Sequence, residues 1–240
     1  MSRTDDFLDA FAAIEKHLRS ATHADRHVGF SATIDRVASS DPAVRRFQDD
    51  LREFADLRNA IIHERSDGHP IADPNERAVR DILRLRDLLL APPRLAPKFI
   101  QPVFCVSLAA PIGVTASEMT RRGFSQAPVT HDGRCVGLLS ANTIARWLGA
   151  SVKEEIVSLT EVTVADVMKH TEDPEHCKFA NREKSLFEIL ELFERHEALG
   201  KRLEAIIVTA QGTDDQALLG IVTIFDLPTL IRETSLSGGR

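Results

Sequence analysis

The sequence predicts an α+β protein in which an all-α helical bundle precedes two β-α-β-β-α repeats. Apolar side chains follow helical spacing over roughly the first 90 residues, and short β-like runs alternate with helical segments after residue 102. Between them lies "APPRLAPKFIQP", residues 91–102, whose prolines interrupt any continuous helix. A chain of 240 residues can bury two modest cores, so we expect two domains.

The bundle begins with "FLDAFAAIEKHL", whose apolar residues fall on one stripe of a helix. A second helix is expected over Phe30, Ile34 and Val37. A longer helix repeats the three-and-four spacing. The stripe residues of the first and the third helix are Phe7, Phe11, Ile14 and Leu18, and Val44, Phe47, Leu51, Phe54 and Ile61.

Two Asp-Pro pairs mark helix starts, because a carboxylate caps a helix well and proline suits the first helical position. Asp41-Pro42 opens the third helix, and Asp73-Pro74 opens a fourth that runs to about Leu90. Four helices joined by short polar loops are therefore predicted.

The second half contains two matching stretches, "APVTHDGRCVGLLSANTIARWL" and "IIVTAQGTDDQALLGIVTIFDLPTLI". Each is interpreted as a strand, a polar turn, a strand, and a helix that opens after Ser or Thr. A helix candidate precedes each copy, "TASEMTRRG" and "SLFEILELFERHEAL". The stretch "MKHTEDPEHCKF" is interpreted as a loop, and "QPVFCVSL" as a β-like run.

These repeats resemble the tandem CBS-domain pair over about residues 100–235. The motif of that family is Gly, two hydrophobic residues, Thr or Ser, two residues, and Asp, and it is intact from Gly220 through Thr223 to Asp226. The resemblance implies two repeats packed through their sheets, with clefts for adenosine-containing ligands such as AMP, ADP, ATP or S-adenosylmethionine.

The residue types suit that chemistry. A helix N-terminus with a hydroxyl, here Thr223, favours phosphate oxygens, while the carboxylate of Asp226 can accept hydrogen bonds from ribose hydroxyls. Gly220 would let a ligand or another backbone approach closely. Alternatively, Thr223 and Asp226 form only a helix-capping pair.

The first repeat departs from the motif, because Gly137 and Ser140 are kept but Thr143 stands at the carboxylate position. A neutral hydroxyl binds ribose less strongly than a carboxylate does. One occupied cleft per chain is therefore expected.

The bundle carries "RNAIIH", residues 58–63, which resembles the Arg-x4-His motif of HEPN domains, a group with many RNA-cleaving toxins. The resemblance implies His63 as general acid or base, Arg58 as the stabiliser of transition-state charge, and Asn59 as a polar helper. On a continuous helix Arg58 and His63 lie about 140° apart, so chemistry would need a distorted helix or paired bundles. In the alternative, Arg58 bonds an acid such as Asp56 or Asp87.

Composition narrows the function classes. A formal charge of −6 argues against a general polyanion binder, so RNA is possible but not favoured. No apolar run approaches the roughly 18 residues that span a bilayer, and the acidic N-terminus is unlike a signal peptide, so a cytoplasmic location is expected. The residues Cys105, Cys135 and Cys177 are expected as buried, reduced thiols without a metal, and Trp147 and the phenylalanines as core.

We therefore expect a HEPN-like bundle at 1–91, a linker at 92–102, and CBS repeats at 103–150 and 151–236. The expected function is regulatory, in which a bound adenine nucleotide controls the bundle of a homodimer. The alternatives are a metal-independent ribonuclease gated by the CBS module, and a purely structural assembly protein.

Overall fold

The computed structural model describes residues 2–22, 28–63, 65–66, 69–70, 72–151, 159–171, 176–214 and 216–236. For residues 63, 65, 66, 69 and 70 it describes the backbone alone. The chain forms two compact units. The first comprises Met1–Pro93, Ser185–Glu191 and Pro228–Arg240, and the second comprises Arg94–Lys184 and Leu192–Leu227.

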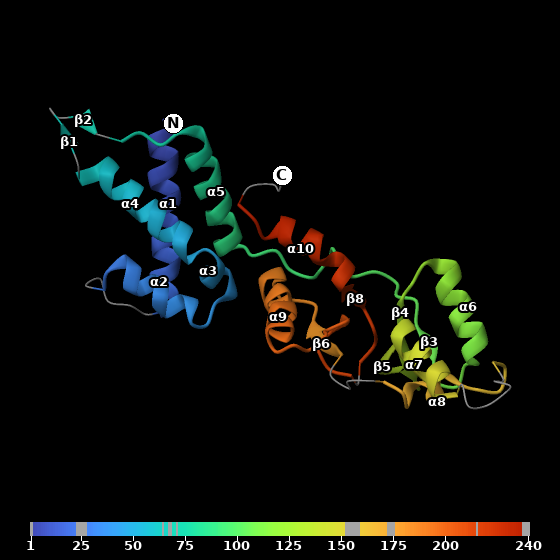
Figure 1. Cartoon of the computed structure of the whole chain (residues 1–240). Helices are drawn as coiled ribbons and strands as arrows, with labels where there is room; N and C mark the ends of the chain where they lie inside the picture. Colours follow the sequence, from blue (N-terminus) through green and yellow to red (C-terminus); the bar gives the residue numbers. More distant parts are fainter. Residues whose placement is uncertain are drawn as a thin grey trace. The chain divides into compact units, whose positions relative to one another are not determined.

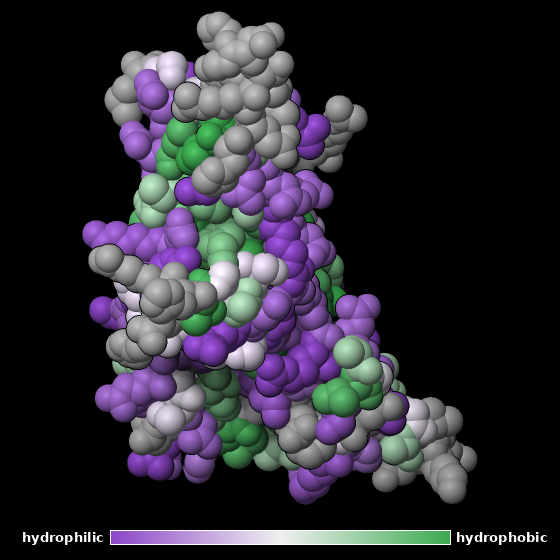
Figure 2. Space-filling view, turned by 90° about the vertical axis from the view of Figure 1, so that its left-hand side faces the viewer, coloured by the Kyte–Doolittle hydropathy of each residue, from purple (hydrophilic) through white to green (hydrophobic). Residues whose placement is uncertain are grey.

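The first unit contains the predicted helical bundle, shown in blue to green in Figure 1. The helices are α1 (Arg3–Thr22), α2 (Phe30–Ala38), α3 (Pro42–Arg46), α4 (Gln48–His63) and α5 (Glu76–Leu90). The short strands β1 (Arg65–Ser66) and β2 (His69–Pro70) form an antiparallel pair that the sequence analysis did not predict. In the face shown in Figure 2, hydrophilic side chains surround smaller apolar patches, as expected for helices that bury one stripe.

The apolar stripes predicted from spacing form the core of this unit. Phe7, Ile14 and Leu18 of α1 are at most 1% exposed, and they share one cluster with side chains of the other helices. The expected single helix over 42–63 is interrupted at Phe47, whose φ of −107° and ψ of 16° separate α3 from α4. The phenylalanine is nevertheless buried, so the spacing indicated burial correctly but not helix continuity.

One predicted cap is confirmed and the other is wrong. The carboxylate of Asp41 accepts hydrogen bonds from the amides of Ala43 and Val44 at 2.8 and 3.2 Å. At the last helix the cap is Asn75, which accepts from the amide of Ala78 at 2.9 Å. Asp73 instead binds the side chains of Arg3 and Thr4. The helix therefore begins two residues later than predicted.

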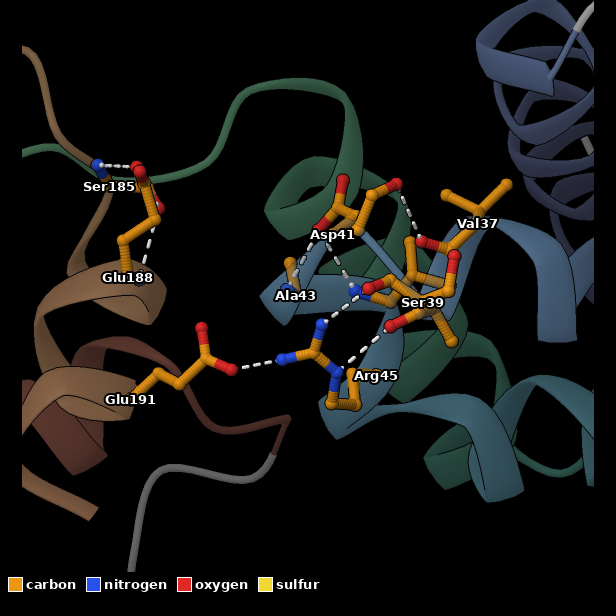
Figure 3. Close-up of polar contacts among 11 residues, drawn as sticks. Val37, Ser39, Asp41, Ala43, Arg45, Ser185, Glu188 and Glu191 are labelled. Carbon is orange, nitrogen blue, oxygen red and sulfur yellow. Dashed lines mark hydrogen bonds and ion pairs between the residues drawn. The ribbon is translucent and has the colours of Figure 1, made fainter. Parts of the chain in front are cut away.

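The first unit also includes the start of α9 (Leu186–Ala198). Phe187 is 2% exposed and packs edge-on against Phe47, with ring centroids 5.8 Å apart. Arg45 is hydrogen-bonded to the carbonyls of Ala38 and Ser39 and also pairs with Glu191 of α9 (Figure 3). Residues distant in sequence therefore complete the core of the bundle.

The C-terminal segment joins the same unit. Helix α10 (Leu227–Glu233) ends where the guanidinium of Arg84 donates to the carbonyl of Glu233 at 2.8 Å. Leu236 packs against the core cluster of the bundle.

Both predicted β-α-β-β-α repeats are present, and the second unit contains them except for the start of α9 and nearly all of α10. The first is β3 (Val106–Ser107), α6 (Ile112–Arg122), β4 (Gln126–His131), β5 (Arg134–Ser140) and α7 (Ala141–Ser151). The second begins after α8 (Val164–Met168) with β6 (Cys177–Asn181), continues through α9, β7 (Ala205–Thr209) and β8 (Gly220–Thr223), and ends with the 3-10 turn η1 (Ile224–Asp226) and α10.

Both sheets have the same topology. The first strand is parallel to the second, and the second is antiparallel to the third, in the orders β3-β4-β5 and β6-β7-β8. The prediction that Cys177 lies in a loop is wrong, because β6 begins at that residue and pairs with Ala205 of β7. The strand in "QPVFCVSL" is confined to two residues.

The proline-rich segment is not a free linker. Leu95 is fully buried, its amide donates to the carbonyl of Lys184, and the amide of Gln101 donates to the carbonyl of Leu219. Helix α5 ends at Leu90, just before the prolines, and the segment from Arg94 onward is part of the second unit. Within the described residues, no helix is long and apolar enough to cross a membrane.

Candidate functional site

The second unit contains a cavity of about 340 Å³ at the predicted Gly220–Asp226 motif. We call it the Asp226 cleft. Its lining residues come from the segment before β3, from the loop and strand after α6, and from β8 and η1. They are Gln101, Pro102, Val103, Phe104, Gly123, Phe124, Ser125, Gln126, Pro128, Ile221, Thr223, Phe225 and Asp226.

Thr223 and Asp226 are linked to each other at the edge of this cleft. The amide and the hydroxyl of Thr223 donate to Oδ2 of Asp226 at 2.7 and 3.0 Å. The capping alternative is therefore present, with the carboxylate as acceptor. Because the hydroxyl of Thr223 donates its proton to Asp226, its oxygen can only accept a hydrogen bond from a ligand. It does not supply the donor that was expected for a phosphate. Oδ1 of Asp226 accepts no hydrogen bond from the described residues, so it can accept one from a ligand hydroxyl.

Aromatic side chains form much of the apolar wall. The rings of Phe104 and Phe124 lie 5.7 Å apart at 33°. Phe124 is 45% exposed and Phe225 is 72% exposed. The expectation that the phenylalanines are core is wrong for these two. Exposed rings beside a cavity can stack on a planar base. Composition alone could not predict that these rings are exposed there.

The arginines beside the cleft share one carboxylate, that of Glu118. The guanidinium of Arg122 lies 4.8 Å from the centroid of Phe104 and donates to Glu118 at 2.5 Å. Hydrogen bonds from Arg121 and then Arg122 lower the pKa of Glu118 to about 2. No lysine or arginine is among the residues that line the cleft in the described structure.

Gly220 acts through the backbone and does not line the cleft. A Cβ atom at this position would lie 1.9 Å from the carbonyl oxygen of Phe99. The glycine thus permits the proline-rich segment to approach β8. Of the two expectations for Gly220, close approach of another backbone and close approach of a ligand, the structure shows the first.

The motif of the first repeat lies in a separate cavity of about 300 Å³, the Ser140 cleft. Its lining residues are Ser140, Asn142, Thr143, Thr171, His176, Gly200, Lys201, Arg202 and Glu204. Ser140 and Thr143 are buried, with their hydroxyl oxygens 3.1 Å apart, and the amide of Thr143 donates to Oγ of Ser140 at 3.2 Å. The predicted hydroxyls therefore come together, but mainly to cap α7.

Glu204 is a residue of the Ser140 cleft that the sequence analysis missed. It is 6% exposed, and its Oε2 is buried without a hydrogen bond from the described residues. Two hydrogen bonds hold the backbone of Glu204. Its amide donates to the carbonyl of His176 at 2.7 Å, and its carbonyl accepts from Nε2 of Gln126 at 3.1 Å.

The sequence matches the CBS domain family over residues 99–150 and 164–233, which is half of the chain. The chain belongs to the CBS domain family. The two motifs that line the clefts occupy equivalent positions in its two CBS repeats. Comparison with curated proteins gives no match.

Several solved structures are also similar to this chain. A putative archaeal homologue of γ-AMPK from Methanocaldococcus jannaschii is 17% identical, with a TM-score of 0.44 over 76% of this chain and 62% of that one. CbpB in complex with c-di-AMP is 15% identical, with a TM-score of 0.45 over 65% and 93%. CBSX2 in complex with AMP is 16% identical, with a TM-score of 0.40 over 54% and 90%.

Outside the CBS repeats, "RNAIIH" lies at the end of α4. Arg58 is half-buried and donates to Oδ1 of the exposed Asn59 at 3.2 Å. Asp87, one of the acids expected beside Arg58, accepts instead from Arg86 at 2.7 Å. His63 is the last residue of the helix, and its side chain lies outside the described structure, so the catalytic pairing stays a prediction.

Proposed function

We propose that the CBS pair binds an adenine nucleotide in the Asp226 cleft and thereby regulates the N-terminal bundle. The observation that carries this proposal is the combination of exposed aromatic rings with an available carboxylate oxygen on Asp226. Rings can stack on adenine, and the carboxylate can accept from ribose hydroxyls.

The cleft also indicates which nucleotides fit best. Because its lining contains an acid and no lysine or arginine, each added phosphate increases the repulsion. AMP and S-adenosylmethionine are therefore expected to bind more tightly than ADP or ATP. A titration panel should also include c-di-AMP, since the solved structures above include one complex with AMP and one with c-di-AMP.

The route to the bundle follows the chain. Asp226 immediately precedes α10, whose C-terminal end is bound by Arg84 and whose next residues reach the bundle core. A nucleotide that prefers one conformation of the Thr223–Asp226 turn would change the population of two arrangements of the bundle.

Substitution of Asp226 tests the proposal. Asp226→Ala should weaken AMP binding in calorimetry by about 1.5 to 3 kcal/mol, the scale of a hydrogen bond to a charged group. Thr143→Ala is the matched control at the equivalent position of the first repeat and should change AMP binding little. Equal losses from both substitutions, or none from Asp226→Ala, would assign the nucleotide to another cleft.

In this proposal residues 1–91 are the regulated bundle, 92–102 connect it to the CBS pair, and 103–150 and 151–236 are the repeats of a cytoplasmic homodimer. The likeness of the bundle to HEPN domains is part of the proposal. A ribonuclease is not favoured, because the guanidinium of Arg58 is engaged by Asn59 on an uninterrupted helix. Cleavage of single-stranded RNA in EDTA by the wild-type chain, but not by His63→Ala, would overturn this preference.

A further inference from the structure

The two clefts of the CBS pair differ in chemistry. The Asp226 cleft has phenylalanine rings and no lysine or arginine, whereas the Ser140 cleft has Lys201, Arg202 and Glu204 and no phenylalanine, tyrosine or tryptophan among its described lining residues. A ligand chosen by stacking in the first cleft would find no such ring in the second. The second cleft therefore offers charge recognition in place of base stacking.

Glu204 is the observation that points to a ligand. Its side chain is 8% exposed, and Oε2 has no hydrogen-bond partner among the described residues. Oε1 forms an ion pair with Nε of Arg202 at 3.6 Å, longer than a hydrogen bond, and the arginine side chain is 68% exposed. A buried carboxylate is unfavourable unless donors reach it, so an unoccupied acceptor of this kind is suited to a cationic donor.

The position of this carboxylate is fixed by secondary structure. Glu204 immediately precedes β7, and its amide and carbonyl are bonded to His176 and Gln126. A simple loop movement therefore does not take the Glu204 carboxylate out of the cleft. A hydrogen-bond donor for it has to come from the ligand.

The rest of the cleft favours negative charge. Lys201 and Arg202 contribute to its lining, and the first turn of α7, an eleven-residue helix, presents Asn142 and Thr143 there. Helix N-termini and basic side chains both attract anions. A cation acceptor and an anion-attracting wall thus occur within one cavity of about 300 Å³.

We propose that the Ser140 cleft binds a small zwitterion, with an ammonium group on Glu204 and an anionic group at Lys201 and the start of α7. This ligand differs in class from the nucleotide proposed for the Asp226 cleft, and neither proposal depends on the other. Glu204 is then the residue that determines specificity in the second cleft.

The test uses O-phosphoethanolamine as the zwitterionic probe, with inorganic phosphate and ethanolamine as its two halves, in calorimetric titrations of the full chain. O-phosphoethanolamine should bind at least about tenfold more tightly than either half. In Glu204→Gln, which keeps the shape of the side chain, binding of O-phosphoethanolamine should weaken about tenfold and phosphate binding should stay within about twofold. AMP binding should be unchanged in this variant.

Three results would overturn the proposal. They are no binding of O-phosphoethanolamine, equal binding of inorganic phosphate, and an unchanged affinity in Glu204→Gln whose melting temperature shows that it folds. A fourth such result is competition by AMP that persists in Asp226→Ala, because it would place a nucleotide in this cleft and overturn the assignment of a different ligand class to it. Loss of AMP binding in Asp226→Ala alone tests only the other cleft, so the two proposals can fail separately.

Discussion

Asp226 and Glu204 show how local context decides what a carboxylate can do. Asp226 caps a turn with one oxygen and keeps the other for a ligand, whereas Glu204 is buried next to a strand with one oxygen unsatisfied. The motif around Asp226 made its position predictable. Glu204 follows a leucine in "KRLEAIIV" without any motif of its own, and its burial depends on contacts with His176 and Gln126, distant in sequence.

The cysteines should differ in reactivity. Burial and then the nearby Cys135 raise the pKa of Cys177 to about 11, although the charge of Lys178 lowers it slightly. Burial also raises the pKa of Cys135. The thiolate is the reactive form, so at pH 8 roughly one Cys177 thiol in a thousand is reactive. The expectation of a buried thiol is wrong for Cys105, which is exposed, so timed iodoacetamide labelling followed by mass spectrometry should modify Cys105 first. Labelling of Cys177 should accelerate as the pH rises towards 11, and equal rates for Cys105 and Cys177 at pH 8 would contradict this assignment.

Asp50 is expected to destabilise the bundle at neutral pH. Burial and then the charge of Glu53 raise its pKa. A raised pKa means that the folded state favours the protonated carboxyl, so the stabilising contribution is complete below the unfolded pKa of 3.8 and is lost as the pH rises through the folded pKa. Asp50→Asn should therefore increase the free energy of unfolding at pH 7 by less than about 1 kcal/mol, with the gain disappearing near pH 3.

The neighbouring Asp49 supplies the control for that measurement. Its side chain is 88% exposed and it pairs with Arg52 at 2.8 Å. Asp49→Asn should give no gain in chemical unfolding at pH 7. A similar gain from both substitutions would indicate a general effect of net charge.

At the scale of elements, local patterns predicted where helices and strands form better than they predicted which elements pack together. The β-α-β-β-α order was confirmed in both repeats because alternation and turn residues are local signals. The break at Phe47 was not predicted, since the apolar spacing continues across it. Membership of α9 in the bundle core could not be predicted either, because it depends on a contact between residues 140 positions apart.

Phe187 provides the test of that contact. The side chain is 2% exposed in the bundle core, so Phe187→Ala should lower the free energy of unfolding of the full chain by about 3 to 5 kcal/mol. Leu199→Ala, just beyond α9 and 67% exposed, is the matched control and should have little effect. Denaturant unfolding followed by circular dichroism would measure both. A loss of under about 1 kcal/mol in Phe187→Ala would mean that the bundle is complete without α9.

At the scale of the whole molecule, sequence and structure agree on class. The order of a helical bundle and two CBS repeats was read from periodicity, a proline-rich break and a repeated motif, and each is a property of contiguous residues. The two compact units do not follow the chain order. Ser185–Glu191 and Pro228–Arg240, from the second half of the chain, belong to the same unit as the N-terminal residues. Such exchange between segments depends on which surfaces pack best, which no local pattern records.

The last prediction concerns assembly. Twofold dimers are the commonest oligomers, so we expect this chain to form a homodimer. Light scattering at micromolar concentration should give about twice the chain mass of 26.6 kDa. If the nucleotide regulates the bundle through this assembly, AMP should change the dimer dissociation constant in wild-type protein and not in Asp226→Ala, because linkage requires unequal affinity for the two states. A strict monomer with and without AMP would rule out regulation through pairing, and would also leave Arg58 and His63 of one chain without a second pair.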